Sequence, residues 1–179
     1  MNRKAVFLDR DGVINEVIFR VNDKPIAPWS FKEFKLCDGI TEPLRELKNS
    51  GYLLFVVSNQ PDISKGLVTS EVVERMNDII VSQFPIEKVV FCSHEDIHNC
   101  SCRKPKPGMI IELAYEYEID LNLSFMIGDN WKDINAGEAA GCSTVLIQKA
   151  YNKNVKADFY IQSLAEATDI INSMGVKSK

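Results

Sequence analysis

The stretch AVFLDRDG, residues 5–12, joins four apolar residues to two aspartates and a glycine. A short apolar run that ends at once in polar residues is typical of a strand buried on both faces of a parallel sheet. The same pattern recurs at residues 53–58, 89–92, 125–128 and 144–147, and residues 158–161 are a candidate edge strand. These runs predict a sheet whose strands come from most of the length of the chain.

Segments with the apolar spacing of helices lie between these runs, at residues 41–49, 69–84, 108–118, 132–140 and 164–174. Gly51 and Gly141 stand where helix ends favour a left-handed residue. Alternating strands and helices predict an α/β fold, a Rossmann-like, open, mainly parallel sheet with helices on both faces. A chain of 179 residues suits a single domain, which we expect to span residues 1–179.

The charge and the apolar content disfavour several functional classes. The net charge of −4 weighs against a nucleic-acid coat and against a protein of anionic membrane surfaces. No apolar run approaches the roughly 20 residues of a membrane span, and the N-terminal run at residues 5–8 is too short for a secretory signal peptide. We therefore expect a cytoplasmic protein that binds neither nucleic acid nor membrane. For its oligomeric state we assume a monomer.

Polar residues follow four of the predicted strands, at the edge where ligands bind in open α/β sheets. They are Asp9 and Asp11 after the first strand, Ser58, Asn59 and Gln60 after the second, Arg103 and Lys104 beyond the third, and Asp129, Asn130 and Asp133 after the fourth. A parallel sheet would bring all of them to one edge. This convergence is the main indication of a functional site in the sequence.

Asp9 and Asp11 are two residues apart, and in an extended chain such residues face the same way, about 6.5 Å apart. One carboxylate can then attack or bind a metal while the other moves a proton. Asp129 would add a third carboxylate, and oxygen ligands of this kind suit Mg²⁺. An Asx turn closed by Gly12 explains the motif equally well in isolation. It does not explain the other strand ends, where Lys104 would supply the charge that a phosphoryl group exploits.

The segment CSHEDIHNCSCRKPKPG, residues 92–108, holds three of the five cysteines and both histidines. In a reducing cytosol, clustered cysteines indicate a metal more often than a disulfide. Three thiolates and one imidazole make a tetrahedral structural zinc set that leaves no open position for water. The candidate ligands are Cys92, His94, Cys100 and Cys102, with His98 as the competing imidazole. Buried or incidental thiols are the alternative interpretation.

Four segments recur in the order of a known set of motifs: FLDRDGVIN (residues 7–15), VVSNQ (56–60), RKPKPG (103–108) and MIGDNWKDI (126–134). They resemble the four motifs of the haloacid dehalogenase superfamily of phosphatases over nearly the whole chain. The cysteine segment before RKP resembles the group that contains the heptose bisphosphate phosphatases and the histidinol-phosphatase domain. Its Cys-x-His pattern favours His94 over His98 as a zinc ligand.

The resemblance implies a phosphatase, with a role for each matching residue. Asp9 would be the nucleophile that forms an aspartyl-phosphate, and Asp11 the general acid for the leaving group and then the base for water. Asp9, the backbone carbonyl of Asp11 and Asp129 would bind Mg²⁺. Ser58 and Lys104 would hold the transferring phosphoryl oxygens, and this arrangement agrees with the charge that in-line phosphoryl transfer requires.

Superfamily members often carry a cap domain, but residues 17–36 are too few for one, so we expect a nearly capless enzyme with an open site. Specificity would then rest on residues 16–28, residues 60–66 and the zinc loop. Trp29 and Phe31 could stack on a sugar or a base, or form the core of a flap. The expected substrate contacts are Arg103, Asn59, Gln60 and Asn130, with Asp133 supporting Asp129.

Two local cues for the substrate disagree. SNQPDISKG, residues 58–66, resembles the heptose enzymes, whereas the short zinc loop resembles the histidinol-phosphatase domain, and Asn130 stands where heptose enzymes often have a lysine. We expect the small phosphorylated substrate to be a sugar phosphate, with the C7 phosphate of D-glycero-D-manno-heptose 1,7-bisphosphate first. Histidinol phosphate comes second, and other phosphomonoesters or polynucleotide ends third. An alternative from a different functional class is a non-catalytic binding module held together by zinc. The pair Asp9 and Asp11 disfavours this alternative, because a binding module does not need a nucleophile and an acid.

Overall fold

The computed structural model describes residues 3–20 and 24–175. Within these residues the main sheet has six parallel strands in the order β5-β4-β1-β6-β7-β8. The strands are β1 (Lys4–Leu8), β4 (Tyr52–Asn59), β5 (Lys88–Cys92), β6 (Phe125–Gly128), β7 (Ser143–Ile147) and β8 (Phe159–Ile161). The open parallel sheet is confirmed, and β8 is an edge strand, as its sequence indicated.

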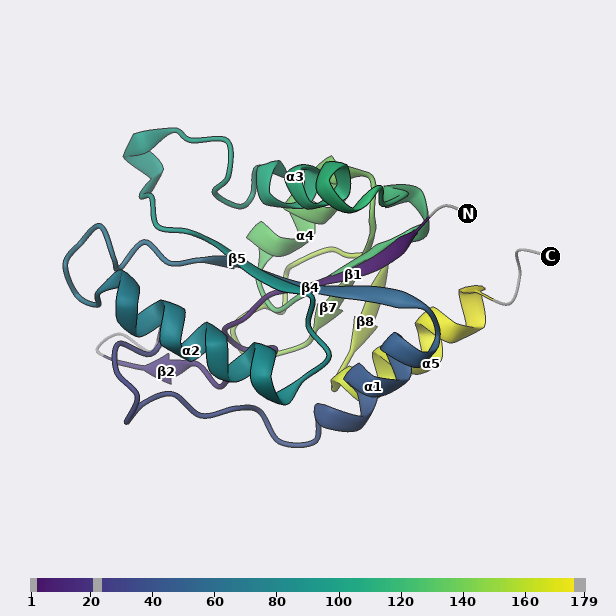
Figure 1. The fold of residues 1–179 in the computed structure, drawn as a ribbon, viewed down its shortest axis with the longest axis horizontal. Coiled ribbons are helices and arrows are strands. Elements are labelled where there is room, and N and C mark those ends of the chain that lie inside the picture. The colour runs from purple at the N-terminus through teal and green to yellow at the C-terminus, as the bar shows by residue number, and fades with distance from the viewer. Residues whose placement is uncertain (1–2, 21–23, 176–179) are drawn as a thin grey trace.

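Helices cover both faces of this sheet (Figure 1). One face carries α1 (Thr41–Asn49), α2 (Ser70–Gln83) and α5 (Leu164–Gly175), and the other carries α3 (Gly108–Tyr117) and α4 (Trp131–Ala140). Each expected helix is present within about two residues of its predicted ends, as is usual for helix boundaries. Thr69 is the N-cap of α2 rather than its first residue, since its side chain accepts a hydrogen bond from the backbone N–H of Val72.

The two faces form two separate cores because side chains alternate along each strand. On β1, Val6 and Leu8 point to the core shared with α1 and α5, and Ala5 and Phe7 point to the core shared with α3 and α4. All four are fully buried. Burying a large apolar side chain stabilises a fold by about 1.5–3 kcal/mol, so a strand that is apolar on both faces belongs at the centre of the sheet.

The connection between β1 and α1 contains a small hairpin that the sequence did not reveal. Its strands, β2 (Ile18–Phe19) and β3 (Pro25–Ile26), pair antiparallel. Residues 21–23, within the segment 16–28 that we expected to influence specificity, lie outside the described residues. The hairpin is far too small to be a cap domain. A pattern of two residues per strand is too short to be recognised by its apolar period.

Trp29 belongs to the base of this hairpin. Its indole N–H donates to the Asp62 carboxylate at 2.8 Å, and the Arg20 guanidinium lies 3.8 Å from its ring centroid. These contacts favour the flap-core interpretation of Trp29 over stacking on a substrate. Phe31 is partly exposed under the Arg75 guanidinium, 4.7 Å from its ring centroid.

The order of the strands places a crevice at one edge of the sheet. The chain runs from β1 outward through β4 to β5, then returns to the other side of β1 and continues through β6, β7 and β8. Ligands bind where the order reverses in this way, outside the carboxyl ends of the strands. This switch point lies between β1 and β6, directly before Asp9 and Asp129. No helix in the described part of the chain is long and apolar enough to cross a membrane.

Candidate active site

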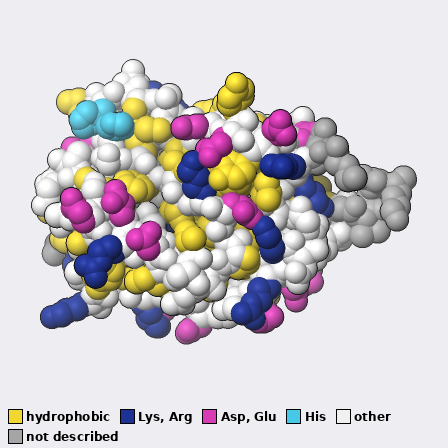
Figure 2. All heavy atoms as spheres, in the orientation of Figure 1, with side chains coloured by type: hydrophobic (Ala, Val, Ile, Leu, Met, Phe, Trp, Pro, Cys, Tyr) yellow, Lys and Arg dark blue, Asp and Glu magenta, His cyan; other side chains and the backbone are white. Residues whose placement is uncertain are grey.

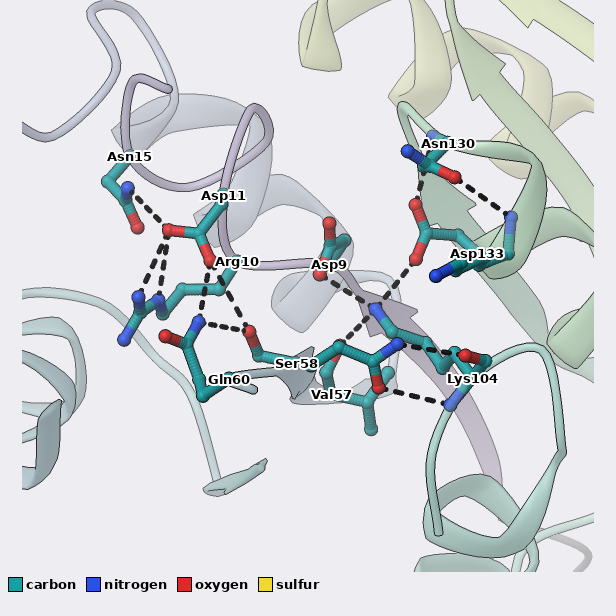
Figure 3. Close-up of polar contacts among 12 residues, drawn as sticks. Asp9, Arg10, Asp11, Asn15, Val57, Ser58, Gln60, Lys104, Asn130 and Asp133 are labelled. Carbon is teal, nitrogen blue, oxygen red and sulfur yellow. Dashed lines mark hydrogen bonds and ion pairs between the residues drawn. The ribbon is translucent and has the colours of Figure 1, made fainter. Parts of the chain in front are cut away.

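Lys104 and Asp9 form the buried centre of the site (Figure 3). The Lys104 ammonium donates to Asp9 Oδ1 at 2.7 Å and to the backbone oxygen of Val57 at 2.6 Å. It also lies 2.6 Å from Asp133 Oδ1. A residue 95 positions away from Asp9 thus reaches it because β5 and β1 end at the same edge of the sheet.

The charges at this centre influence one another strongly. Burial raises the pKa of Asp9 well above its usual value, and the nearby carboxylate of Asp133 raises it further, while Lys104 lowers it. Burial acts to lower the pKa of Lys104, but Asp133 and Asp9 together raise it above its usual value. Lys104 is therefore a fixed cation, placed where a phosphoryl group would bring negative charge.

Asp129 lies at the end of β6, across the switch point from Asp9. Burial raises its pKa to about 7, Asp133 adds to the effect, and a hydrogen bond from the Tyr151 hydroxyl to Oδ2 opposes it. Gly12 makes room for this carboxylate: a Cβ on Gly12 would lie 1.9 Å from Asp129 Oδ2, and the φ of Gly12 is +92°. The glycine of Asp-x-Asp-Gly is thus required both for the turn and for the approach of Asp129.

Three carboxylates are placed so that they can hold a cation. One oxygen from each of Asp9, Asp129 and Asp133 lies within 4.8 Å of the others. Oxygen donors of this kind fit Mg²⁺, and a cation would offset the burial and the carboxylate repulsion that together raise the pKa of Asp9 and Asp129. From the sequence we predicted that Asp133 supports Asp129 and does not itself bind the metal. In the structure its Oδ1 pairs with Lys104 while its Oδ2 accepts from the backbone N–H of Asn130.

Asp11 faces away from Lys104, on the other side of Asp9 (Figure 3). Its Oδ1 accepts from the guanidinium of Arg10 at 3.0 Å and from Asn15 at 3.0 Å. Its Oδ2 accepts from Gln60 at 2.7 Å and lies 3.5 Å from the Ser58 hydroxyl. The expectation that both aspartates face the same way assumed an extended chain. The strand ends at residue 8 and the chain then turns at residue 12.

Three of the expected substrate contacts have structural partners instead. Gln60 is fully buried beneath Asp11, and its side-chain N–H donates to that carboxylate. Asn59 lines the cavity, but its amide is engaged by the backbone N–H and oxygen of Lys104. Asn130 also lines the cavity, and its side chain caps α4 by accepting from the N–H of Lys132. Each of these side chains thus has at least one hydrogen-bond partner within the protein, while Oε1 of Gln60 has none among the described residues.

Arg103 has a buried nitrogen that is available for a ligand. Its Nε donates to Asp96 Oδ1 at 2.6 Å, whereas its buried Nη1 has no hydrogen-bond partner among the described residues. Arg103 lines the same cavity as Asp9 and Lys104. A buried guanidinium nitrogen without a partner is costly, so an anionic group in the cavity would find a donor already in place.

The cavity above these residues has a volume of about 520 Å³. Its floor is acidic, with Asp9, Asp11, Asp129 and Asp133. Basic side chains also line it: Lys24, Lys65, Arg103, Lys104 and Lys132. An acidic floor with basic walls suits a cation and a phosphorylated molecule bound together.

The cysteine segment forms a second cluster, in the connection between β5 and α3. The Sγ of Cys92 lies 3.6 Å from that of Cys100 and 3.0 Å from that of Cys102, and 3.5 Å from Nδ1 of His94. Tetrahedral zinc with Zn–S bonds of about 2.3 Å places its sulfurs about 3.8 Å apart. The Cys92–Cys100 separation is close to this value, whereas the Cys92–Cys102 separation is shorter. All the cysteines are free thiols.

The two histidines of the cluster segment have different partners. They gather at one end of the molecule (cyan in Figure 2), and their ring centroids are 5.5 Å apart. Nδ1 of His94 is 3.5 Å from the Sγ of both Cys92 and Cys102. Nδ1 of His98 instead accepts from the backbone N–H of Glu95. The structure therefore brings His94, not His98, to the thiols.

Sequence reasoning missed several residues of the site. Arg10 lies between the two aspartates of the first motif, is fully buried and holds Asp11. Tyr151 and Asn152 both contact Asp129, and they follow the end of β7 by four and five residues. A search beyond the end of the fifth strand, like that made for the first four, would have singled out Tyr151.

Comparisons with known proteins identify the family of this chain. The HAD-hydrolase-like family matches residues 101–167. The D-glycero-alpha-D-manno-heptose-1,7-bisphosphate 7-phosphatase of Campylobacter jejuni is 35% identical, over 90% of this chain and 91% of that protein. The D-glycero-beta-D-manno-heptose-1,7-bisphosphate 7-phosphatase of Pasteurella multocida is 34% identical, over 98% of this chain and 100% of that protein.

Two solved structures have the same fold. D,D-heptose 1,7-bisphosphate phosphatase from B. bronchiseptica, complexed with magnesium and phosphate, superposes with a TM-score of 0.82 at 23% identity, over 96% of this chain and 99% of that one. A putative HAD-like phosphatase from Mesorhizobium loti gives a TM-score of 0.77 at 24% identity, over 99% of this chain and 90% of that one. With its curated relatives aligned over nearly their full length, the chain belongs to the HAD-like phosphatases, in the family of the heptose-1,7-bisphosphate 7-phosphatases.

Proposed function

We propose that the protein is a Mg²⁺-dependent phosphomonoester hydrolase that works through an aspartyl-phosphate on Asp9. The observation that carries this proposal is the contact between Asp9 Oδ1 and the Lys104 ammonium at 2.7 Å, at the floor of an open cavity. The acids Asp129 and Asp133 lie beside this pair. A carboxylate, a fixed cation and a candidate metal set together match what phosphoryl transfer needs.

In the first step an Asp9 carboxylate oxygen would form a bond to phosphorus while the bond from phosphorus to the leaving oxygen breaks. Asp11 would leave its contacts with Arg10 and Gln60, take up a proton and give it to that leaving oxygen. In the second step water would attack phosphorus, the bond to Asp9 would break, and Asp11 would take a proton from the water. Lys104 would hold the phosphoryl oxygens throughout. Magnesium held by Asp9, the backbone carbonyl of Asp11 and Asp129, with Asp133 beside them, would supply further positive charge for those oxygens.

The favoured substrate is D-glycero-D-manno-heptose 1,7-bisphosphate, hydrolysed at its C7 phosphate. Support comes from the curated relatives in Campylobacter jejuni and Pasteurella multocida, which carry that activity in their names. The cavity adds a physical reason, because Lys24, Lys65 and Lys132 line it together with Arg103. A bisphosphate has a second anionic group, which these cations would hold away from Lys104.

Histidinol phosphate is the second candidate, on the grounds of the short zinc loop. Polynucleotide ends are third, since basic and acidic side chains are interspersed on the face drawn in Figure 2 and polynucleotide binding depends on neutralising many phosphates. A panel of both anomers of the heptose bisphosphate and histidinol phosphate, assayed for released phosphate, ranks these candidates. A kcat/KM for histidinol phosphate equal to or above that for both heptose anomers would contradict the favoured substrate.

The chemistry itself is tested separately from the substrate. We expect hydrolysis of a generic aryl phosphate in the presence of Mg²⁺, and its loss in Asp9→Asn with the far-UV circular dichroism spectrum unchanged. Near-normal turnover by a folded Asp9→Asn variant would refute the mechanism. A wild-type protein that hydrolyses no phosphomonoester would instead favour the non-catalytic binding module.

We also propose that Cys92, His94, Cys100 and Cys102 hold a structural zinc ion. Their separations and the free state of the thiols support this assignment. Burial acts to raise the pKa of Cys100, but hydrogen bonds from the Arg103 backbone and the neighbouring thiols lower it to about 6. Burial instead raises the pKa of Cys92 to about 12 and raises that of Cys102, so the support for zinc comes from the geometry of the cluster. Metal analysis of protein purified without added zinc should give one zinc per chain. A stoichiometry near zero would remove the assignment.

A further inference from the structure

The segment after β7, residues 148–152, reaches back to the end of β6. The Asn152 amide donates to the backbone oxygens of Asp129 and Ile147, both at 2.8 Å. The Asn152 side-chain oxygen accepts from the backbone N–H of Lys149 at 2.8 Å. Asn152 is buried, so these bonds fix the segment against two neighbouring strands. The residue before it, Tyr151, is thereby held in place.

Tyr151 contacts both the acidic floor of the site and the hairpin above it. Its hydroxyl donates to Asp129 Oδ2. Its ring packs against Phe19 of β2, with 6.1 Å between the ring centroids. The same Asp129 oxygen faces Gly12 on another side, where a Cβ would lie 1.9 Å away. The Asp129 carboxylate therefore has a donor on one side and a close backbone on another, and little freedom to rotate.

A carboxylate that binds a metal depends on such partners. Groups that hydrogen-bond to metal ligands fix the orientation of the ligand, and their loss typically weakens metal binding by about 10- to 100-fold. Tyr151 is such a hydrogen-bonding partner for Asp129, and it lies outside the four sequence motifs. Its ring contact with Phe19 also connects Asp129 to the hairpin that borders the cavity.

We propose that Tyr151 is a positioning residue that orients the Asp129 carboxylate for a divalent cation and links it to the β2–β3 hairpin. This inference rests on the proposed function, because it assumes that Asp129 is a cation ligand. It differs from that function in assigning part of the cation affinity to a residue beyond the end of β7. The hydroxyl, rather than the ring, is the group that carries the effect.

Tyr151→Phe removes the hydroxyl and keeps the ring. We expect a dissociation constant for Mn²⁺, measured by electron paramagnetic resonance on the zinc-loaded protein, that rises about 10-fold. The Mg²⁺ concentration for half-maximal hydrolysis should rise in parallel, while kcat at saturating Mg²⁺ stays within about threefold of wild type if the loss is one of affinity. Tyr115→Phe is the matched control, because Tyr115 is 90% exposed on α3 and should leave both values unchanged.

Two outcomes contradict the proposal in different ways. Unchanged Mn²⁺ affinity in Tyr151→Phe, with Asp129→Asn clearly weakened, would remove the role of Tyr151 and leave the proposed function intact. Unchanged Mn²⁺ affinity in Asp129→Asn would show that Asp129 is not a ligand, and the metal site of the proposed function would fail with it.

Discussion

Gly12 shows how one missing side chain can shape the site. Its φ of +92° disfavours any other residue, and a Cβ there would collide with Asp129 Oδ2. Gly39 is a matched control, since its φ is +73° and no atom lies within 4 Å of where its Cβ would be. We expect both Gly→Ala variants to lose about 1–3 kcal/mol for the strained backbone. Only Gly12→Ala should also lose hydrolysis, because Asp129 must move.

The measurements are urea unfolding for stability and phosphate release for activity. Gly12→Ala activity within a factor of about two of Gly39→Ala would mean that Asp129 tolerates the displacement, which would contradict a tight approach of its carboxylate to Gly12. Stability and activity must be compared at the same Mg²⁺ concentration, because bound ligand adds to the free energy of unfolding.

The two aspartates of the first motif should separate activity from stability. Asp9 is one of three acids around Lys104, and its raised pKa means that its ionised form is unfavourable in the fold. Asp9→Asn should be inactive and at least as stable as wild type at neutral pH. Asp11 instead pairs with the fully buried Arg10. Asp11→Asn should lose activity and about 1–3 kcal/mol of unfolding free energy, because a buried donor loses its charged acceptor.

Urea unfolding in Mg²⁺-free buffer gives this comparison directly. The ranking Asp9→Asn at or above wild type, with Asp11→Asn below it, is the expected result. The reverse ranking would mean that the Lys104 pair contributes more to stability than the repulsion around it removes.

At the scale of elements, the β5–α3 connection carries two basic residues that are anchored differently. Lys104 is held by the core, through the Val57 oxygen and through its backbone bonds to Asn59. Arg103 is held by Asp96, within the loop that the thiol cluster closes. Losing the proposed zinc should therefore disturb Arg103 and leave Lys104 in place.

Cys100→Ser tests this difference. We expect KM for the favoured bisphosphate to rise about 10-fold, as for one lost charged hydrogen bond, with kcat changed by less than about threefold. Cys37→Ser is the control, because Cys37 lies outside the cluster. Kinetics must be accompanied by zinc analysis of each variant. A collapse of kcat at unchanged KM would show that the loop positions Lys104 instead.

The elements also show what the sequence could and could not predict. The main strands and helices were predictable because each is an apolar run or a helical repeat of ordinary length. The hairpin β2–β3 was not, because two residues have no recognisable period. Convergence of Asp9, Lys104 and Asp129 followed from strand direction alone. The orientation of Asp11 did not, because it depends on the buried side chain of Arg10, and a pattern of spacing contains no information about such a partner.

For the molecule as a whole, the open sheet concentrates charge at one edge. Three carboxylates and the Lys104 ammonium meet there because β1, β5 and β6 all end at that edge. The arrangement costs stability in the absence of a cation, and the raised pKa values of Asp9 and Asp129 express that cost. Tight cores on both faces of the sheet supply the stability that allows it.

This cost predicts a pH dependence of stability for the Mg²⁺-free protein. The pKa of Asp129 is about 7 in the fold, above its usual value of 3.8, so the folded state binds this proton more tightly than the unfolded state. The stabilisation from that proton is fully present below about pH 4 and is lost as pH rises through 7. Between pH 5 and 7 the unfolding free energy of wild type should fall relative to Asp129→Asn by up to about 1.4 kcal/mol per pH unit.

Urea unfolding of both proteins across this range measures the difference, and adding Mg²⁺ at pH 8 should raise the stability of wild type more than that of the variant. A difference that stays flat with pH would mean that Lys104 and Tyr151 already compensate the charge of Asp129.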